Sequence, residues 1–149
     1  ASGQRPLLSF YLDTSVIVPL IVKETTSTVV DRWLNHAGDA ITTSRWAIVE
    51  LSSAIGLKVR AGALDPVQAA TALGLFSSDV LPSLSLVEIE PVHMTSVAAL
   101  LARFDLGLRA GDALHLAIAH ATPATTLVTF DRRLREACIA IGLAAIEPS

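Results

Sequence analysis

The chain alternates between short apolar runs and segments of helical periodicity. Apolar runs bounded by polar or turn residues predict strands at 7–12, 40–44, 84–90, 126–130 and 143–147. Apolar residues at helical spacing predict helices at 25–37, 44–62, 64–83, 92–105, 110–121 and 131–142. Strands that alternate with amphipathic helices are typical of an α/β fold, with a central, mainly parallel sheet covered on both faces.

Capping residues support two of these helices. Ser44 is an N-cap candidate for the helix that follows it, and Gly62 ends the same segment. Asp65 followed by Pro66 is an ordinary helix start, because a proline at the first helical position gives up only an N–H that would be unpaired anyway. No repeat, low-complexity tract or linker interrupts the pattern, so we expect a single domain over residues 1–149.

Several features predict a cytoplasmic protein. No run of about 18 uncharged apolar residues is present. Asp13 and Pro19 interrupt the run that most resembles a signal peptide, and no small-residue cleavage site follows. Cys138 is the only cysteine, so an internal disulfide is excluded, and we expect the thiol to pack in the core. Residues 1–6 are expected to be disordered or not native to the chain and are left out of any site.

Charge does not exclude a nucleic-acid partner. The formal net charge is −3, from 11 basic and 14 acidic residues. If four of the acids surrounded metal ions, the rest of the surface would be close to neutral, and Arg132, Arg133 and Arg135 would form a basic cluster on it. RNA therefore remains a candidate substrate.

Four acids lie where an α/β fold places its ligands. Asp13 and Asp131 end predicted strands, and open α/β sheets bind ligands at the carboxyl ends of their strands. Asp131 could be only a helix N-cap, and Asp112 could only favour the positive end of its helix. Glu50 lies too deep in its helix for a capping box, so its carboxylate reaches solvent or faces a positive group.

The segments "YLDTSVIV", "WAIVELSSAIG", "LRAGDALHLAIA" and "LVTFDRRL" carry these acids in order. Together they resemble the four acidic motifs of PIN-domain ribonucleases and, among these, of VapC toxins from toxin-antitoxin pairs. The resemblance covers nearly the whole chain and implies a PIN-like three-layer α/β/α sandwich. It also implies that the metal ligands and catalytic residues are Asp13, Glu50, Asp112 and Asp131.

The same resemblance implies a function and partners. Ser15 and Thr129 would line the pocket, with Thr14 a lesser candidate. The protein would be an Mg²⁺- or Mn²⁺-dependent endoribonuclease that hydrolyses RNA phosphodiester bonds with a metal-activated water. It would be the toxin of a pair, held by a small VapB-like antitoxin, and a homodimer. Carboxylates suit this chemistry independently, because both cations prefer hard oxygen ligands and a two-metal site can activate water.

Two other functions remain open. The first is a PIN-like module that binds RNA or protein without catalysis, which loss of the acids would favour. The second is a metal-dependent phosphatase. A haloacid-type phosphatase would need a second aspartate where Ser15 stands, and a receiver-type domain would need a late lysine, whereas the lysines are Lys23 and Lys58.

Several other residues could have either a structural or a functional role. His115 follows Asp112 by one helical turn and could orient that acid, contact RNA or make a structural hydrogen bond. Trp33 and Trp46 favour packing over base stacking. The three arginines after Asp131 could hold RNA phosphates or form a solvated helix face. The apolar helices at 25–36 and 44–61 predict a groove for a segment that folds on binding.

Overall fold

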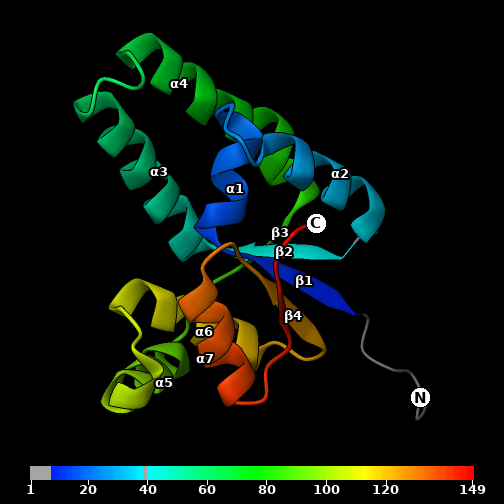
Figure 1. The fold of residues 1–149 in the computed structure, drawn as a ribbon, viewed down its shortest axis with the longest axis vertical. Coiled ribbons are helices and arrows are strands. Elements are labelled where there is room, and N and C mark those ends of the chain that lie inside the picture. The colour runs from blue at the N-terminus through cyan, green and yellow to red at the C-terminus, as the bar shows by residue number, and fades with distance from the viewer. Residues whose placement is uncertain (1–7, 39) are drawn as a thin grey trace.

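A computed structural model describes residues 8–38 and 40–149 and shows a three-layer α/β/α sandwich (Figure 1). The strands are β1 Ser9–Leu12, β2 Ile41–Ser44, β3 Ser85–Val87, β4 Thr125–Val128 and β5 Ala145–Ile146. They form a five-stranded sheet in the order β3-β2-β1-β4-β5, and every pair is parallel. The predicted α/β class and mainly parallel sheet are confirmed. Residues 1–6, expected to be disordered or not native, lie outside the described residues.

Helices cover both faces of this sheet. The helices are α1 Thr14–Ile21, α2 Ser27–Ala37, α3 Arg45–Arg60, α4 Pro66–Leu75, α5 Pro91–Ala102, α6 Ala110–Ala121 and α7 Arg132–Ala140. One layer contains α1 to α4 and the other α5 to α7, with the sheet between them (Figure 1). None of the described helices is long and apolar enough to cross a membrane.

The apolar core is divided by the sheet into two clusters. Tyr11 and Leu127 are register partners on β1 and β4 and belong to the cluster under α5, α6 and α7. The next pair, Leu12 and Val128, belongs to the cluster under α1 to α4. This alternation follows from the two-residue period of a strand. Cys138 is fully buried in the first cluster, as expected of a packing residue.

The predicted helix caps are confirmed. Ser44 Oγ accepts from the backbone N–H of Ala47 at 3.3 Å. Asp65 forms a reciprocal capping box with Gln68, and Pro66 is the first residue of α4. These caps fix where α3 and α4 begin.

Four segments differ from the prediction. The pattern predicts no element at 14–21, where the structure has α1, with Pro19 inside it. The predicted helix 64–83 is α4 followed by a π-helical turn, Phe76–Val80, and a 3₁₀ helix, Leu81–Ser83. The predicted helix 92–105 ends at Ala102, and a separate 3₁₀ helix covers Phe104–Leu106. The third strand covers less than the predicted 84–90.

Candidate active site

The candidate site lies at the carboxyl ends of the two central strands. Asp13 directly follows β1, and Thr129 directly follows β4. These strands are parallel neighbours with Leu12 opposite Val128, so the two residues that follow them lie side by side. Helices supply the remaining acids, Glu50 from α3 in one layer and Asp112 from the first turn of α6 in the other.

Asp13 is buried and held by two hydroxyl groups. Ser15 Oγ donates to Oδ1 at 2.6 Å, and Thr129 Oγ1 donates to Oδ2 at 2.5 Å. The side chain makes no N-cap hydrogen bond to α1, although it occupies the N-cap position. Burial raises the pKa of Asp13, against the opposing effects of His115 and the two hydroxyls. This carboxylate is aimed at the site and not at its own helix.

Glu50 faces a histidine. Its Oε1 accepts from Thr14 Oγ1 at 2.7 Å and hydrogen-bonds to His115 Nε2. Burial raises the pKa of Glu50, but the hydrogen bonds from His115 and from the Thr14 hydroxyl outweigh it, so the pKa is lowered overall. The sequence leaves two interpretations for Glu50: its carboxylate reaches solvent or faces a positive group. In the structure the carboxylate faces another residue and is half-buried.

Asp112 has no such partner. Burial raises the pKa of its carboxyl group, and the negative charges of Asp131, Glu50 and Asp13 add to that effect. Within residues 8–38 and 40–149 no hydrogen bond or ion pair reaches this carboxylate. Its position therefore concentrates negative charge at the edge where the strands end.

Asp131 has a structural role as well. Its Oδ1 accepts from the backbone N–H of Arg133 at 2.9 Å and of Leu134 at 3.3 Å, which makes it the N-cap of α7. Its own backbone N–H donates to Thr129 Oγ1 at 2.9 Å, so Thr129 links the two aspartates. The capping interpretation is confirmed, and it uses only one carboxylate oxygen.

The three arginines after Asp131 all have local partners. Arg132 pairs with Glu136 at 2.9 Å on the exposed face of α7. Arg133 Nη1 donates to the carbonyl of Gly107, and Arg135 Nη1 donates to the carbonyl of Thr129 at 2.9 Å. Contact with RNA by these side chains stays a prediction; the side chain of Arg132 is 85% exposed.

Four further residues shape the site. Thr14 and His115 bind Glu50, and Tyr11 binds the other nitrogen of His115 at 2.6 Å. A Cβ atom on Gly111 would lie 2.9 Å from Glu50 Oε2, so glycine leaves the carboxylate room that a side chain there would take from it. The sequence showed His115 beside Asp112, but not that it turns toward Glu50, which comes from another helix.

The donor set suits a divalent cation, although the carboxylates are not closed around one point. In the described ranges no three Asp, Glu, His or Cys side chains converge tightly enough to hold an ion. Asp13, Glu50 and Asp131 each accept local hydrogen bonds, while Oε2 of Glu50 and the carboxylate of Asp112 accept none from the residues that the structure describes. The four carboxylates supply hard oxygen donors, which are the ligands that Mg²⁺ and Mn²⁺ prefer.

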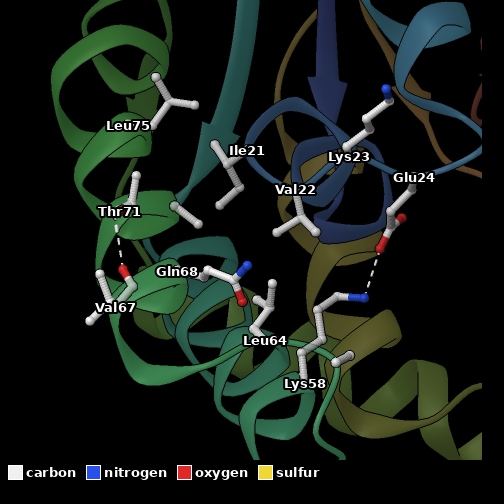
Figure 2. Close-up of a pocket in the computed structure, with 12 residues that line it drawn as sticks. Ile21, Val22, Lys23, Glu24, Lys58, Leu64, Val67, Gln68, Thr71 and Leu75 are labelled. Carbon is white, nitrogen blue, oxygen red and sulfur yellow. Dashed lines mark hydrogen bonds and ion pairs between the residues drawn. The ribbon is translucent and has the colours of Figure 1, made fainter.

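Two connected hollows lead away from the site. A cavity of about 430 Å³ includes Ser15 and Phe130 and shares Glu24 and Lys58 with a groove of about 520 Å³. Figure 2 shows this groove, with the Lys58–Glu24 ion pair of 2.7 Å at one end. Apolar side chains from α1, α4 and the segments beside them line the rest: Ile21, Val22, Leu64, Val67 and Leu75.

This position differs from the groove predicted between helices 25–36 and 44–61. Of those helices, the larger groove is lined only by Lys58. The smaller cavity does touch α3, through Ala54 and Leu57, and the N-cap of α2, Thr26.

Comparison with known proteins agrees with this architecture. Residues 10–140 match the PIN domain family. The chain is 37% identical over 147 residues to Ribonuclease VapC35 of Mycobacterium tuberculosis, covering 93% of this chain and 96% of that protein.

Solved structures share the fold at low sequence identity. The M. tuberculosis VapC20 structure, described as a sarcin-ricin-loop-cleaving toxin, has a TM-score of 0.71 at 18% identity and covers 94% of this chain and 100% of its own. FitAcB from Neisseria gonorrhoeae has a TM-score of 0.71 at 19% identity over 93% of this chain and 97% of its own. With the family match and the VapC35 identity, these findings show that the chain belongs to the PIN-domain family and, within it, to the VapC group.

Proposed function

We propose that this protein is a divalent-metal-dependent endoribonuclease that acts as the toxin of a toxin-antitoxin pair. The observation that carries the proposal is the gathering of Asp13, Glu50, Asp112 and Asp131 from four separate elements at one edge of the sheet. No salt-bridging lysine or arginine in the described chain neutralises these carboxylates. Membership of the VapC group supports RNA as the substrate.

A bound Mg²⁺ or Mn²⁺ would offset the carboxylate charge, polarise a phosphodiester and lower the pKa of attacking water. Asp13, Glu50 and Asp112 would hold the cation, together with the oxygen of Asp131 that does not cap α7. Ser15 and Thr129 fix the orientation of Asp13, so its carboxylate does not turn to cap α1. The chain thereby supplies a negatively charged, preorganised pocket whose geometry depends on hydroxyl groups beside the acids.

The RNA backbone must approach an acidic pocket, so basic side chains nearby are needed. Arg132 lies on the first turn of α7, directly after Asp131, and its side chain is 85% exposed. Its ion pair with Glu136 is a surface pair, and such pairs contribute little to stability. Exchange of Glu136 for an RNA phosphate would therefore cost little, which supports Arg132 as the leading phosphate contact.

Cleavage assays on RNA, DNA and a phosphomonoester, each with and without Mn²⁺, test the activity. We expect cleavage of RNA only with metal. Asp13→Asn, Glu50→Gln and Asp112→Asn should each reduce cleavage by at least about a hundredfold, and Asp131→Asn by less, because part of its role is structural. Asp31→Asn, which removes an exposed acid on α2, is the matched control and should keep cleavage intact.

The outcomes separate the alternatives. Hydrolysis of the phosphomonoester alone would favour a phosphatase, and RNA binding without cleavage would favour a binding module. Cleavage that survives in Asp13→Asn protein free of contaminating nuclease would overturn the proposed mechanism.

The antitoxin proposal rests on the groove shown in Figure 2. An amphipathic segment could place apolar side chains between α1 and α4, where Val67 is 75% exposed. The adjoining cavity extends from Glu24 and Lys58 to Ser15, which contacts Asp13. A segment that continued along it could place a basic side chain among the acids, where a charge-assisted contact would compete with metal or RNA.

A homodimer is a further part of the proposal. Exposed apolar side chains outside the groove are candidates for its contacts: Val49, Leu57, Val92, Met94 and Phe104. Light scattering on the purified chain measures the oligomeric state, and a monomer at all accessible concentrations would contradict this part.

A further inference from the structure

A chain of hydrogen bonds joins the start of α3 to Glu50, which lies further along the same helix. Ser44 Oγ contacts Tyr11 Oη at 2.7 Å, and Tyr11 Oη contacts His115 Nδ1 at 2.6 Å. The other ring nitrogen, Nε2, contacts Glu50 Oε1. The chain therefore passes from α3 through β1 and α6 and back to α3.

Three of the four members of this chain are shielded from water. Tyr11 and Ser44 are 0% exposed and His115 is 1% exposed. A buried polar group costs free energy unless it is hydrogen-bonded, and here both nitrogens of the imidazole have partners. An aliphatic residue would suit this part of α6 better for packing alone, because the flanking residues Leu114 and Leu116 are buried in the core.

The hydrogen bonds have a consistent direction. Ser44 Oγ already accepts from the N–H of Ala47, so its own proton is available for Tyr11. A tyrosine phenol carries its proton at neutral pH, so Tyr11 Oη donates to Nδ1. In a neutral imidazole the proton then lies on Nε2, which donates to the Glu50 carboxylate.

Helix α6, which carries His115, also lies beside Oε2, the other carboxylate oxygen of Glu50. Gly111 and His115 are four residues apart and lie on one face of α6. His115 and Thr14 bind Oε1, while Oε2 lies beside Gly111, where a Cβ would come within 2.9 Å. Oε2 accepts no hydrogen bond in the described part of the chain, so it is the oxygen left for a cation.

We propose that Tyr11 and His115 are positioning residues: Tyr11 fixes the Nε2–H tautomer of His115, and His115 holds Oε1 of Glu50 so that Oε2 points into the site. The proposal rests on the proposed metal-dependent function. It assigns His115 to Glu50 and not to Asp112, its neighbour on α6. It also gives Tyr11 a role through its hydroxyl group, beyond the core packing of its ring.

Two substitutions at His115 distinguish positioning from packing. The amide nitrogen of glutamine can reach the place of Nε2 and donate to Glu50, whereas that of asparagine reaches only the place of Nδ1. Binding of Mn²⁺ to the metal-free protein is measured by electron paramagnetic resonance of the free ion. We expect His115→Asn to weaken binding by about tenfold or more, as loss of a partner that orients a metal ligand does, and His115→Gln to restore most of it.

Tyr11→Phe tests the outer link without removing the ring. ¹⁵N shifts of the His115 ring in metal-free wild-type protein should show the Nε2–H tautomer, and Tyr11→Phe should show a mixture of tautomers with weaker Mn²⁺ binding. This readout does not depend on bound metal, and it remains informative if His115→Asn fails to fold.

The failures are distinguishable. Equal Mn²⁺ affinity in wild type, His115→Asn and Tyr11→Phe, with RNA cleavage intact, would overturn the positioning role alone. An Nδ1–H tautomer in the wild type would do the same. A wild-type protein that binds no Mn²⁺ and cleaves no RNA would overturn the proposed function, and this inference with it.

Discussion

At the scale of single residues, the acids differ in what surrounds them. Asp13 is buried between two hydroxyls, and Glu50 is paired with an imidazole. Asp112 lies near three other carboxylates and His115, and within the described residues it accepts no hydrogen bond. Burial penalises the charged form, whereas hydrogen bonds from hydroxyl groups stabilise it. Four carboxylates that look equivalent in sequence therefore contribute differently to stability and to cation binding.

Asp13 should destabilise the metal-free fold at neutral pH. Its folded-state pKa is raised above the ordinary 3.8, so the folded state holds its proton to higher pH than the unfolded chain does. The free energy of unfolding therefore falls as the pH rises through that interval. In EDTA at pH 7 we expect Asp13→Asn to raise the Tm by a few degrees, with the gain lost below about pH 4.

Added Mn²⁺ should raise the Tm of the wild type above that of Asp13→Asn. The wild type gains stability from a ligand that the variant binds poorly. Thermal melts across pH, with and without Mn²⁺, measure both effects. Asp105→Asn is the control: Arg103 lowers the pKa of that exposed carboxyl group, so its loss should not stabilise the fold. A variant at Asp13 that melts below the wild type in EDTA at pH 7 would contradict the argument.

At the scale of elements, α6 approaches the site through a glycine. Gly111→Ala would add a Cβ that lies 2.9 Å from Glu50 Oε2 and 3.3 Å from Trp46 Cζ2, so the carboxylate would have to move. Alanine in place of glycine also favours a helix by about 0.5–1 kcal/mol. We expect Mn²⁺ affinity and RNA cleavage to fall by about tenfold while the Tm stays close to that of the wild type.

Gly74→Ala on α4 is the matched control, since its Cβ would meet nothing within 4 Å. It should raise the Tm and leave cleavage unchanged. Isothermal titration with Mn²⁺ and thermal melts on both variants make the comparison. Undiminished Mn²⁺ affinity in Gly111→Ala would show that cation binding does not depend on the present position of the Glu50 carboxylate.

Elements with a clear period or cap were predictable, and those without were not. The starts of α3 and α4 were predictable from their capping residues, Ser44, Asp65 and Pro66. In both cases the local preference agrees with the tertiary structure. By contrast, α1 has five buried residues among eight and contains Pro19, so it offers neither an amphipathic period nor a proline-free run.

The same distinction applies to the site. Asp13 and Asp131 could be identified because each follows a predicted strand, and Glu50 because of its unusual helical position. Asp112 could be identified only through the motif that resembles those of PIN-domain ribonucleases. The partners of these acids could not, because contacts such as Tyr11 with His115 or Thr129 with Asp13 join residues more than 100 positions apart. Such contacts depend on the strand order, which amphipathic patterns do not specify.

At the scale of the whole molecule, the site and the groove are joined on one side of the sheet. The groove borders α1 and α4, and the smaller cavity continues from Glu24 and Lys58 to Ser15 beside Asp13. A partner bound in the groove could therefore block the acids without a conformational change in the core. Binding and inhibition would then be separable, because apolar contacts hold the segment and only its end reaches the site.

We expect Val67→Asp to weaken antitoxin binding without affecting catalysis. Val67 is an exposed apolar residue of the groove, and none of the four candidate acids lines that groove, so cleavage of RNA by the free protein should stay at the wild-type rate. A carboxylate there would have to be desolvated against an apolar segment, which weakens binding. We expect the antitoxin to bind at least tenfold less tightly and co-expression to rescue bacterial growth poorly.

Ile139→Asp, which changes an exposed apolar residue on α7 outside the groove, is the control and should retain both binding and rescue. Full inhibition of Val67→Asp by the antitoxin would place the partner on another surface and leave the nuclease proposal untouched.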